Sequence, residues 1–181
     1  MIPALVIIDM QQGSFTPMTA RHDAAGLVAR LNALAARVRR AGGLVVFVQH
    51  DGPEGDPHHP AHPGWQLLPG LDARPDDPVV RKTACDAFLG TALDEVLRAH
   101  GAGGLIVTGC ATDYCVDTTV RAALARGWRT VVPSDGHTTA DRPHLPAVKI
   151  IEHHNAIWAD FIAPAGPATV LPCAAVALAV G

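Results

Sequence analysis

The chain has 181 residues, of which 49% are hydrophobic and 17% are charged, and its formal net charge is -3 at pH 7. This length and apolar content suffice for one buried core, so we expect a single domain over residues 1–181. The slightly acidic balance offers no basic surface for phosphate groups, which argues against a nucleic-acid partner.

Other features of the sequence bear on where the protein works. Its apolar runs all fall short of the roughly 20 residues that a membrane-spanning helix needs, so we expect no membrane contact. The N-terminal stretch has no Lys or Arg ahead of its apolar residues and reaches an acid at Asp9, unlike a signal peptide. Four cysteines without paired CxxC spacing argue against a disulfide scaffold and a structural zinc site. We therefore expect a cytoplasmic protein.

Short apolar runs alternate with longer segments of helical period, a pattern typical of β-α-β units. The expected strands are 4–8, 44–49, 78–80, 104–108 and 130–132. The expected helices are one capped by Asp23 and ended by Gly42 and Gly43, then 91–100, 113–126 and 144–155, and residues 169–180 would add a strand and a short helix. The sequence thus predicts an α/β fold that is Rossmann-like and three-layered, with a mostly parallel central sheet flanked by helices.

A long loop over residues 51–77 interrupts this alternation. Its six prolines exclude a regular helix or a central strand, and a loop of this length in a compact domain is usually functional or disordered. The acids Asp51, Glu54 and Asp56 within it favour a neutral or cationic substrate.

Chemically active side chains follow several of the predicted strands. Asp9 follows the first, Lys82 follows the third, and Cys115 lies shortly after the fourth. Because ligands bind beyond the carboxyl ends of the strands in an open parallel sheet, we expect these side chains to meet at one edge. An acid, an ammonium group and a thiol together suit hydrolysis with a cysteine nucleophile.

Each of the three residues also has a structural interpretation. Cys115 falls in the first turn of a predicted helix, with Thr112 or Asp113 as N-cap, where a thiolate is stabilised; the alternative is a small buried packing residue. Asp9 would act as a base toward the thiol, or cap the turn that follows it. Lys82 would keep Asp9 ionised for catalysis; the alternatives are a structural ion pair with Asp9 or a solvated lysine. The presence of all three favours the catalytic interpretation.

Three segments resemble the isochorismatase-like cysteine hydrolases. They are Leu5-Val-Ile-Ile-Asp-Met-Gln, Lys82 followed by Asp86-Ala-Phe-Leu-Gly-Thr-Ala-Leu, and Gly109-Cys-Ala-Thr-Asp-Tyr-Cys-Val. The resemblance is spread over most of the chain. Cys115 points to the amidase branch, because true isochorismatases cleave a vinyl ether without a cysteine nucleophile. The chain is also similar to small bacterial members that include streptothricin hydrolases.

The resemblance implies a role for each matching residue. Asp9, Lys82 and Cys115 would form the catalytic triad, the bond between Cys110 and Ala111 would be a cis peptide, and the N–H groups of Ala111 and Cys115 would form the oxyanion hole. Asp9 would deprotonate the thiol, the thiolate would attack an amide-type carbonyl, and water would hydrolyse the thioester. No cofactor is implied.

The resemblance also suggests where a substrate would lie. Phe15, His50, Trp65 and Tyr114 are candidate pocket residues, with simple packing as the alternative for the aromatic side chains.

Nicotinamidases in this family bind a metal through an Asp-x-His pair after the second strand. Here the order is reversed, as His50-Asp51, and the later His58, His59 and His62 lie in the proline-rich loop. We therefore expect no metal, and interpret these residues as a polar loop at the mouth of the pocket.

Two other functions remain open from the sequence. One is the hydrolysis of an isochorismate-like ether by proton transfer from Asp9, and the other is a catalytically silent α/β domain that binds a small molecule. The expected partner is a small amide-like substrate, and the family resemblance implies a homo-oligomer, a dimer or larger.

Overall fold

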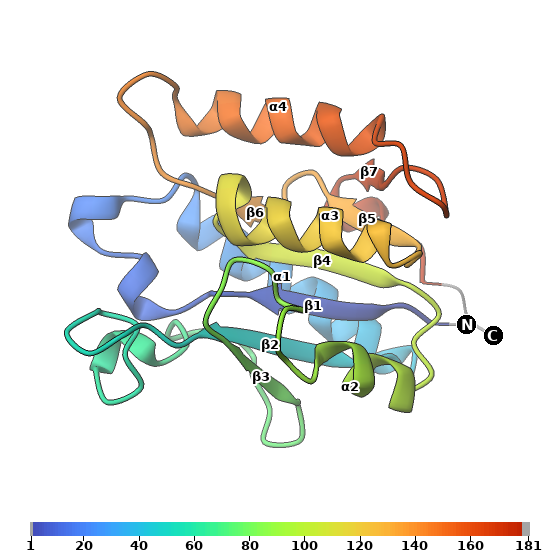
Figure 1. The fold of residues 1–181 in the computed structure, drawn as a ribbon, viewed down its shortest axis with the longest axis horizontal. Helices are drawn as coiled ribbons and strands as arrows, with labels where there is room; N and C mark the ends of the chain where they lie inside the picture. Colours follow the sequence, from blue (N-terminus) through green and yellow to red (C-terminus); the bar gives the residue numbers. More distant parts are fainter. Residues whose placement is uncertain (1, 179–181) are drawn as a thin grey trace.

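The computed structural model describes residues 2–178 and contains one parallel sheet of seven strands (Figure 1). The strand order is β3-β2-β1-β4-β5-β7, and β6 pairs with the end of β4. The strands are β1 (Ala4–Ile8), β2 (Val45–His50), β3 (Val79–Lys82), β4 (Leu105–Cys110), β5 (Thr130–Pro133), β6 (His137–Thr138) and β7 (Thr169–Leu171). This architecture confirms the predicted fold class.

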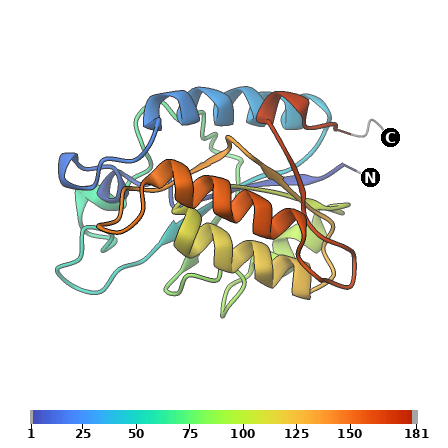
Figure 2. The same ribbon diagram turned by 90° about the horizontal axis from the view of Figure 1, so that it is seen from above.

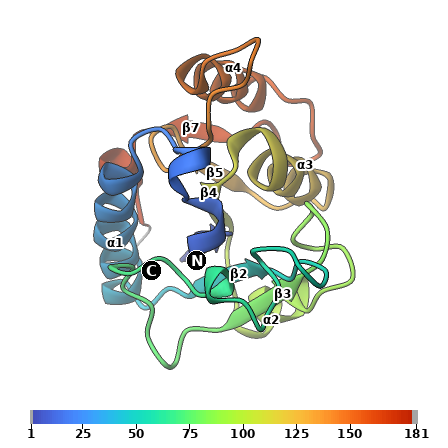
Figure 3. The ribbon, with the colours of Figure 1, turned by 90° about the vertical axis from the view of Figure 1, so that its left-hand side faces the viewer.

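Helices cover both faces of the sheet and form the outer two of three layers. Helix α1 lies on one face, while α2, α3 and α4 lie on the other (Figures 2 and 3). The helices are α1 (Ala24–Arg40), α2 (Leu93–Ala99), α3 (Asp117–Ala125) and α4 (Ala147–Ala159), with a π-helical turn over Thr112–Val116 ahead of α3. Within residues 2–178, no helix combines the length and the apolar character needed to cross a bilayer.

Strand β1 shows why this sequence forms the centre of the sheet. All five of its residues are buried, and successive side chains enter the cores on opposite faces. Val6 and Ile8 pack with α2 and α3, whereas Leu5 and Ile7 pack with α1. Because both faces are covered, β1 reads as a continuous apolar run, and its carboxyl end is held in a fixed position.

The N-terminus of α1 differs from the expected side-chain cap. Asp23 occupies the cap position in a left-handed conformation, with φ of 46°, and its carboxylate makes no capping hydrogen bond. The carboxylate instead accepts a hydrogen bond from Nη1 of Arg30 at 2.8 Å. Asp23 therefore occupies the predicted N-cap position, while its carboxylate is paired with Arg30 along the helix.

The helix predicted over 113–126 is divided in two, and neither Thr112 nor Asp113 caps it. The Thr112 hydroxyl lies 2.9 Å from Nδ1 of His137, and the Asp113 carboxylate pairs with Arg142 at 2.8 Å. Both side chains are thus engaged by the segment that follows β5. This tertiary demand overrides the local capping preference.

Other boundaries shift where long-range contacts extend or shorten an element. Strand β3 continues to Lys82, and α4 begins at Ala147 instead of residue 144, after the Asp141 carboxylate accepts a hydrogen bond from the Ala147 N–H at 2.8 Å. Helix α4 then runs on to Ala159, because Trp158 is fully buried in the core. Strand β7 and a 3-10 turn (Cys173–Ala175) supply the strand and short helix expected near the C-terminus; residues 179 and 180 of that prediction lie outside the described residues.

Gly109 brings the end of β4 close to the end of β1. Its φ is +118°, and a Cβ at this position would lie 2.1 Å from the carbonyl oxygen of Ile8. Only glycine therefore permits this approach, which places Cys110 and the residues after it beside Asp9.

The buried side chain of His137 joins β6, α4 and the π-helical turn that precedes α3. His137 in β6 is 3% exposed, and its Nε2 lies 3.0 Å from Oδ1 of Asn155 in α4. The amide of Asn155 donates to the Ser134 carbonyl, so Oδ1 accepts from Nε2–H of His137, and Nδ1 accepts the Thr112 hydroxyl proton. The ring is held neutral, and burial lowers the pKa of His137 to about 4.

This network predicts acid sensitivity. The unfolded chain binds a proton at His137 below about pH 6.5, but the folded chain does so only near pH 4, so acidification between these values favours unfolding by up to about 3 kcal/mol. Urea unfolding of wild type and His137→Gln at about pH 7 and pH 4.5 measures this contribution. We expect a smaller loss of stability on acidification in the variant. Replacing the exposed His144 in His144→Gln is the control, and an equal loss in wild type and His137→Gln would contradict the prediction.

Candidate active site

The structure brings Asp9, Lys82 and Cys115 together at the carboxyl edge of the sheet. The Nζ atom of Lys82 lies 2.7 Å from Oδ2 of Asp9 and 3.2 Å from Sγ of Cys115. The ammonium group donates its remaining hydrogen bond to the Ala84 carbonyl at 3.0 Å. All three N–H donors of the lysine are therefore engaged, which fixes the acid and the thiol around one cation.

Each member of this cluster comes from a different part of the fold. Asp9 directly follows β1 with φ of 48°, and its N–H donates to the Val48 carbonyl at 2.9 Å. Lys82 ends β3, which is separated from β1 by β2, and its long side chain reaches Asp9 from there. Cys115 belongs to the π-helical turn after β4. Holding Asp9 in the left-handed region costs about 1–3 kcal/mol, which the surrounding strands must offset.

The charges of the ion pair are deeply buried. The Lys82 side chain is 0% exposed and that of Asp9 is 7% exposed. Burial lowers the pKa of Lys82, but the Asp9 carboxylate and Cys115 outweigh it and raise that pKa above its ordinary value. The ammonium group therefore stays protonated and holds the site's positive charge.

The thiol of Cys115 is a protonated group at rest. Burial, followed by the nearby negative charge of Asp9, raises the pKa of Cys115 well above its usual range, although Lys82 opposes this effect. Burial and Asp9 thus oppose the thiolate stabilisation that a helix N-terminus would provide. Formation of a thiolate here requires a base that accepts the thiol proton.

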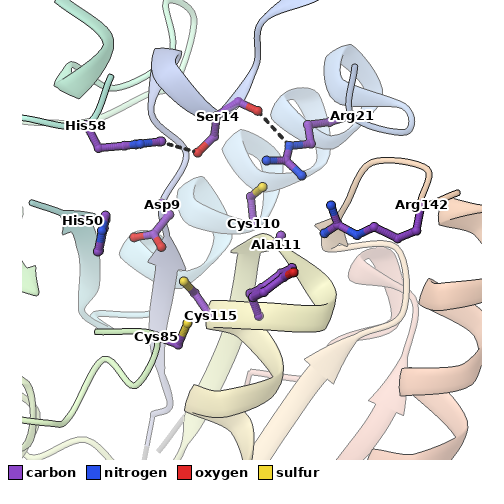
Figure 4. Close-up of a pocket in the computed structure, with 11 residues that line it drawn as sticks. Asp9, Ser14, Arg21, His50, His58, Cys85, Cys110, Ala111, Cys115 and Arg142 are labelled. Atoms are coloured by element: carbon purple, nitrogen blue, oxygen red, sulfur yellow. Dashed lines mark hydrogen bonds between the residues drawn. The ribbon is translucent and has the colours of Figure 1, made fainter. Parts of the chain in front are cut away.

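An open cavity of about 340 Å³ gives access to this cluster (Figure 4). Asp9 and Cys115 line it, and Ala111 and Cys110 lie beside them. The peptide bond between Cys110 and Ala111 is cis, as the family resemblance implies. Oδ1 of Asp9 is buried and has no hydrogen-bond partner within residues 2–178, so it is available to a ligand or to the thiol proton.

The four candidate pocket residues separate into two pairs. His50 and Tyr114 line the cavity, whereas Phe15 and Trp65 lie outside its lining. Phe15 packs against the apolar core beneath α1. The Trp65 indole donates to Asp51 at 2.8 Å and carries the Arg81 guanidinium 5.5 Å above its ring. Trp65 therefore stabilises the proline-rich loop.

The histidines of the proline-rich loop serve local structure. Nδ1 of His59 accepts from the Ala61 N–H, and Nδ1 of His62 accepts from the Gly64 N–H. His58 lies 2.8 Å from the Ser14 hydroxyl through Nε2 and 3.0 Å from Asp56 through Nδ1. Across the described part of the chain, no group of three or more His, Cys, Asp or Glu side chains is placed to hold a metal ion.

Several residues that line the cavity were not predicted from the positions after strands. They lie in loops and connections, which give no periodic pattern in the sequence. They are Ser14, Arg21, His58, Cys85 and Arg142. Ser14 and Arg21 follow β1 at a distance, and Arg142 lies in the connection between β6 and α4. Only the fold brings these segments to one cavity.

The match to known proteins agrees with this geometry. Residues 3–160 match the model of the isochorismatase domain. The chain belongs to the isochorismatase family. The resemblance that the Asp9, Lys82 and Cys115 segments suggested is thereby confirmed.

Proteins similar to this family member include ones named as a hydrolase and as an amidase. It is 40% identical over 147 residues to a streptothricin hydrolase from Streptomyces noursei, covering 81% of this chain and 53% of the relative. A crystal structure of an isochorismatase family protein is 33% identical, with a TM-score of 0.86, and covers 93% of this chain and 97% of its own. The crystal structure of N-carbamoylsarcosine amidase from Thermoplasma acidophilum is 25% identical, with a TM-score of 0.76. The match covers 97% of this chain and 99% of the amidase chain. The chain spans a little over half the length of the streptothricin hydrolases, 53% and 58% of two sequences.

Because the ion pair is buried, removing one charge should lower the free energy of unfolding much more than removing both. Lys82→Met leaves Asp9 buried without its cation and should lower the free energy of unfolding by about 3–5 kcal/mol at neutral pH. Asp9→Asn combined with Lys82→Met removes both charges and should recover much of that loss. Urea unfolding curves measure both effects.

Lys149→Met is a matched control, because Lys149 forms its ion pair with Glu152 on the surface, with side chains 63% and 58% exposed. A loss of stability in Lys82→Met no larger than in this control would contradict the buried pairing.

Proposed function

We propose that this protein is a cysteine hydrolase that cleaves a carbon–nitrogen bond of a small amide-type molecule through a thioester intermediate. The observation that carries the proposal is the Lys82 ammonium group, which bonds Asp9 and Cys115 together in the wall of an open cavity. The relatives named streptothricin hydrolase and N-carbamoylsarcosine amidase support amide-type chemistry.

The first step is transfer of the thiol proton to Asp9. Because the pKa of Cys115 is raised by burial and by Asp9, a free thiolate is disfavoured, and proton transfer must accompany attack on the substrate. Oδ1 of Asp9 has no partner among the described residues and is the receiving atom. Lys82 remains protonated and stabilises the sulfur as it becomes negative.

The second step forms the carbon–sulfur bond. Sγ of Cys115 adds to the substrate carbonyl, whose oxygen gains the negative charge, and the N–H groups of Ala111 and Cys115 would donate to that oxygen. Collapse of this intermediate breaks the carbon–nitrogen bond. The amine leaves with the proton that Asp9 had taken from the thiol, and the acyl group stays on sulfur as a thioester.

Water completes the reaction. Asp9, again ionised, accepts a proton from a water molecule that attacks the thioester. The carbon–sulfur bond then breaks as Asp9 returns this proton to the sulfur, which releases the acid and restores the thiol. Each turnover consumes one water molecule and returns Asp9 and Cys115 to their starting protonation states. His50 lines the same cavity, and burial, followed by the charge of Lys82, lowers the pKa of His50, so a neutral ring faces the substrate.

Amide hydrolysis predicts complete dependence on Cys115. Ammonia release should be measured over primary amides, carbamoyl and ureido compounds and nicotinamide, with mass spectrometry for the ring opening of cyclic amides. On any compound that wild type cleaves, Cys115→Ala and Asp9→Asn should each lower kcat by at least about a thousandfold. Cys173→Ala changes a buried cysteine outside the cavity and should retain activity.

The outcomes separate the proposed reaction from the other two. Hydrolysis that persists in Cys115→Ala would contradict the thioester mechanism, and persistence on an isochorismate-like ether would indicate proton transfer from Asp9 alone. Binding without any hydrolysis across the panel would instead identify a silent binding domain.

A further inference from the structure

The charged groups around the cavity are matched in pairs, with one exception. Asp9 is paired with Lys82, and Arg142 is paired with Asp113, with shortest distances of 2.7 Å and 2.8 Å. Arg21 also lines the cavity, yet it has no carboxylate within ion-pair distance among residues 2–178. The cavity therefore holds an unmatched positive charge.

The backbone around Arg21 is held on both sides. Arg21 forms an antiparallel bridge with Ala140, and the His22 N–H donates to the Thr139 carbonyl at 2.9 Å. The Thr138 hydroxyl donates to the His22 carbonyl at 2.6 Å. These contacts tie the loop after β1 to the segment after β6, so Arg21 is placed by the fold and not by a free loop.

The side chain of Arg21 is oriented by Ser14. Its Nε donates to the Ser14 carbonyl at 2.7 Å, which turns the guanidinium group into the cavity (Figure 4). Nη1 and Nη2 carry no hydrogen bond to the described part of the chain, so these donors are available to a ligand. Arginine is always protonated at neutral pH, and its planar fork matches a carboxylate.

Ser14 is itself immobilised. Its hydroxyl lies 2.8 Å from Nε2 of His58, and Nδ1 of that ring lies 3.0 Å from the Asp56 carboxylate. Because Asp56 accepts from Nδ1–H, Nε2 accepts the Ser14 proton. The chain of contacts from Asp56 through His58 and Ser14 therefore holds Arg21 in place, and the serine oxygen is left as an acceptor facing the cavity.

The acids of the proline-rich loop do not oppose this charge. Asp51 pairs with Arg81 at 2.7 Å, and Asp56 is engaged by His58. Neither carboxylate lines the cavity, and Glu54 lies outside its lining as well. The preference for a neutral or cationic substrate that these acids suggested is therefore not supported by their positions.

We propose that Arg21 binds a carboxylate of the substrate while the scissile carbonyl lies at Cys115. The inference rests on the proposed function and narrows it to small amides or ureido compounds that carry one carboxylate group. A single unmatched cation suits a singly charged anion better than a phosphate dianion. Arg21 is then a specificity-determining residue, separate from the groups that make and break bonds.

Alkylation of Cys115 tests this site without requiring turnover. N-iodoacetylglycine and N-iodoacetylglycinamide have the same reactive carbon, but only the first ends in a carboxylate. In each reaction the sulfur displaces iodide and forms a carbon–sulfur bond. The rate at Cys115 is read by peptide mass spectrometry, and the ratio of the rates for the acid and the amide reports recognition of the carboxylate.

We expect this ratio to fall by about tenfold or more in Arg21→Gln, as for the loss of a charge-assisted hydrogen bond. Arg21→Lys keeps the positive charge but loses the two parallel N–H donors of the guanidinium group. Its ratio should therefore lie between those of wild type and Arg21→Gln. Arg40→Gln changes the net charge equally at an exposed position at the end of α1 and should leave the ratio at the wild-type value. Circular dichroism and thermal melting verify that each variant is folded.

Three results would overturn the proposal: equal ratios in wild type and Arg21→Gln, an equal fall in Arg40→Gln, or no alkylation of Cys115 by either reagent. Failure of the hydrolase proposal looks different. In that case the carboxylate preference persists and depends on Arg21, but no amide or ureido compound is cleaved.

Discussion

The site depends on one buried cation. Lys82 is fully removed from water, and a charge in that position is tolerable only because Asp9 lies 2.7 Å away and two other acceptors complete its coordination. The same contacts place the Cys115 thiol beside a carboxylate. Stability and the proposed chemistry are therefore linked, since the arrangement that satisfies the lysine also places a carboxylate next to a thiol, the groups that the proposed reaction uses as base and nucleophile.

The sheet makes this arrangement possible. Parallel strands end at one edge, and β1 and β4 are adjacent, so Asp9 and the turn that carries Cys115 emerge side by side. Gly109 allows the two strand ends to approach more closely than a side chain would permit. The apolar cores on both faces then fix the strands, which leaves the cavity's specificity to the loops.

The loops perform a different task from the strand ends. Arg21 and His58 have no part in the proposed proton transfers, yet both line the cavity, and Arg21 supplies its unmatched charge. Their contacts join segments that are distant in sequence, such as the 44 residues that separate Ser14 from His58. A substrate would thus meet reactive groups on the sheet edge and recognition groups on the loops.

Apart from the short strand β6, which was not predicted, the sequence alone determined the order of strands and helices, and with it the placement of Asp9, Lys82 and Cys115 near strand ends, because apolar periodicity is a local property. The family resemblance likewise implied that the Cys110–Ala111 peptide bond is cis. The tertiary structure decided the surroundings of Cys115, since burial and the neighbouring Asp9, which raise the pKa of its thiol, depend on contacts between distant segments. It also excluded Trp65 from the cavity and admitted Arg21, because contacts between distant loops leave no local pattern in the sequence.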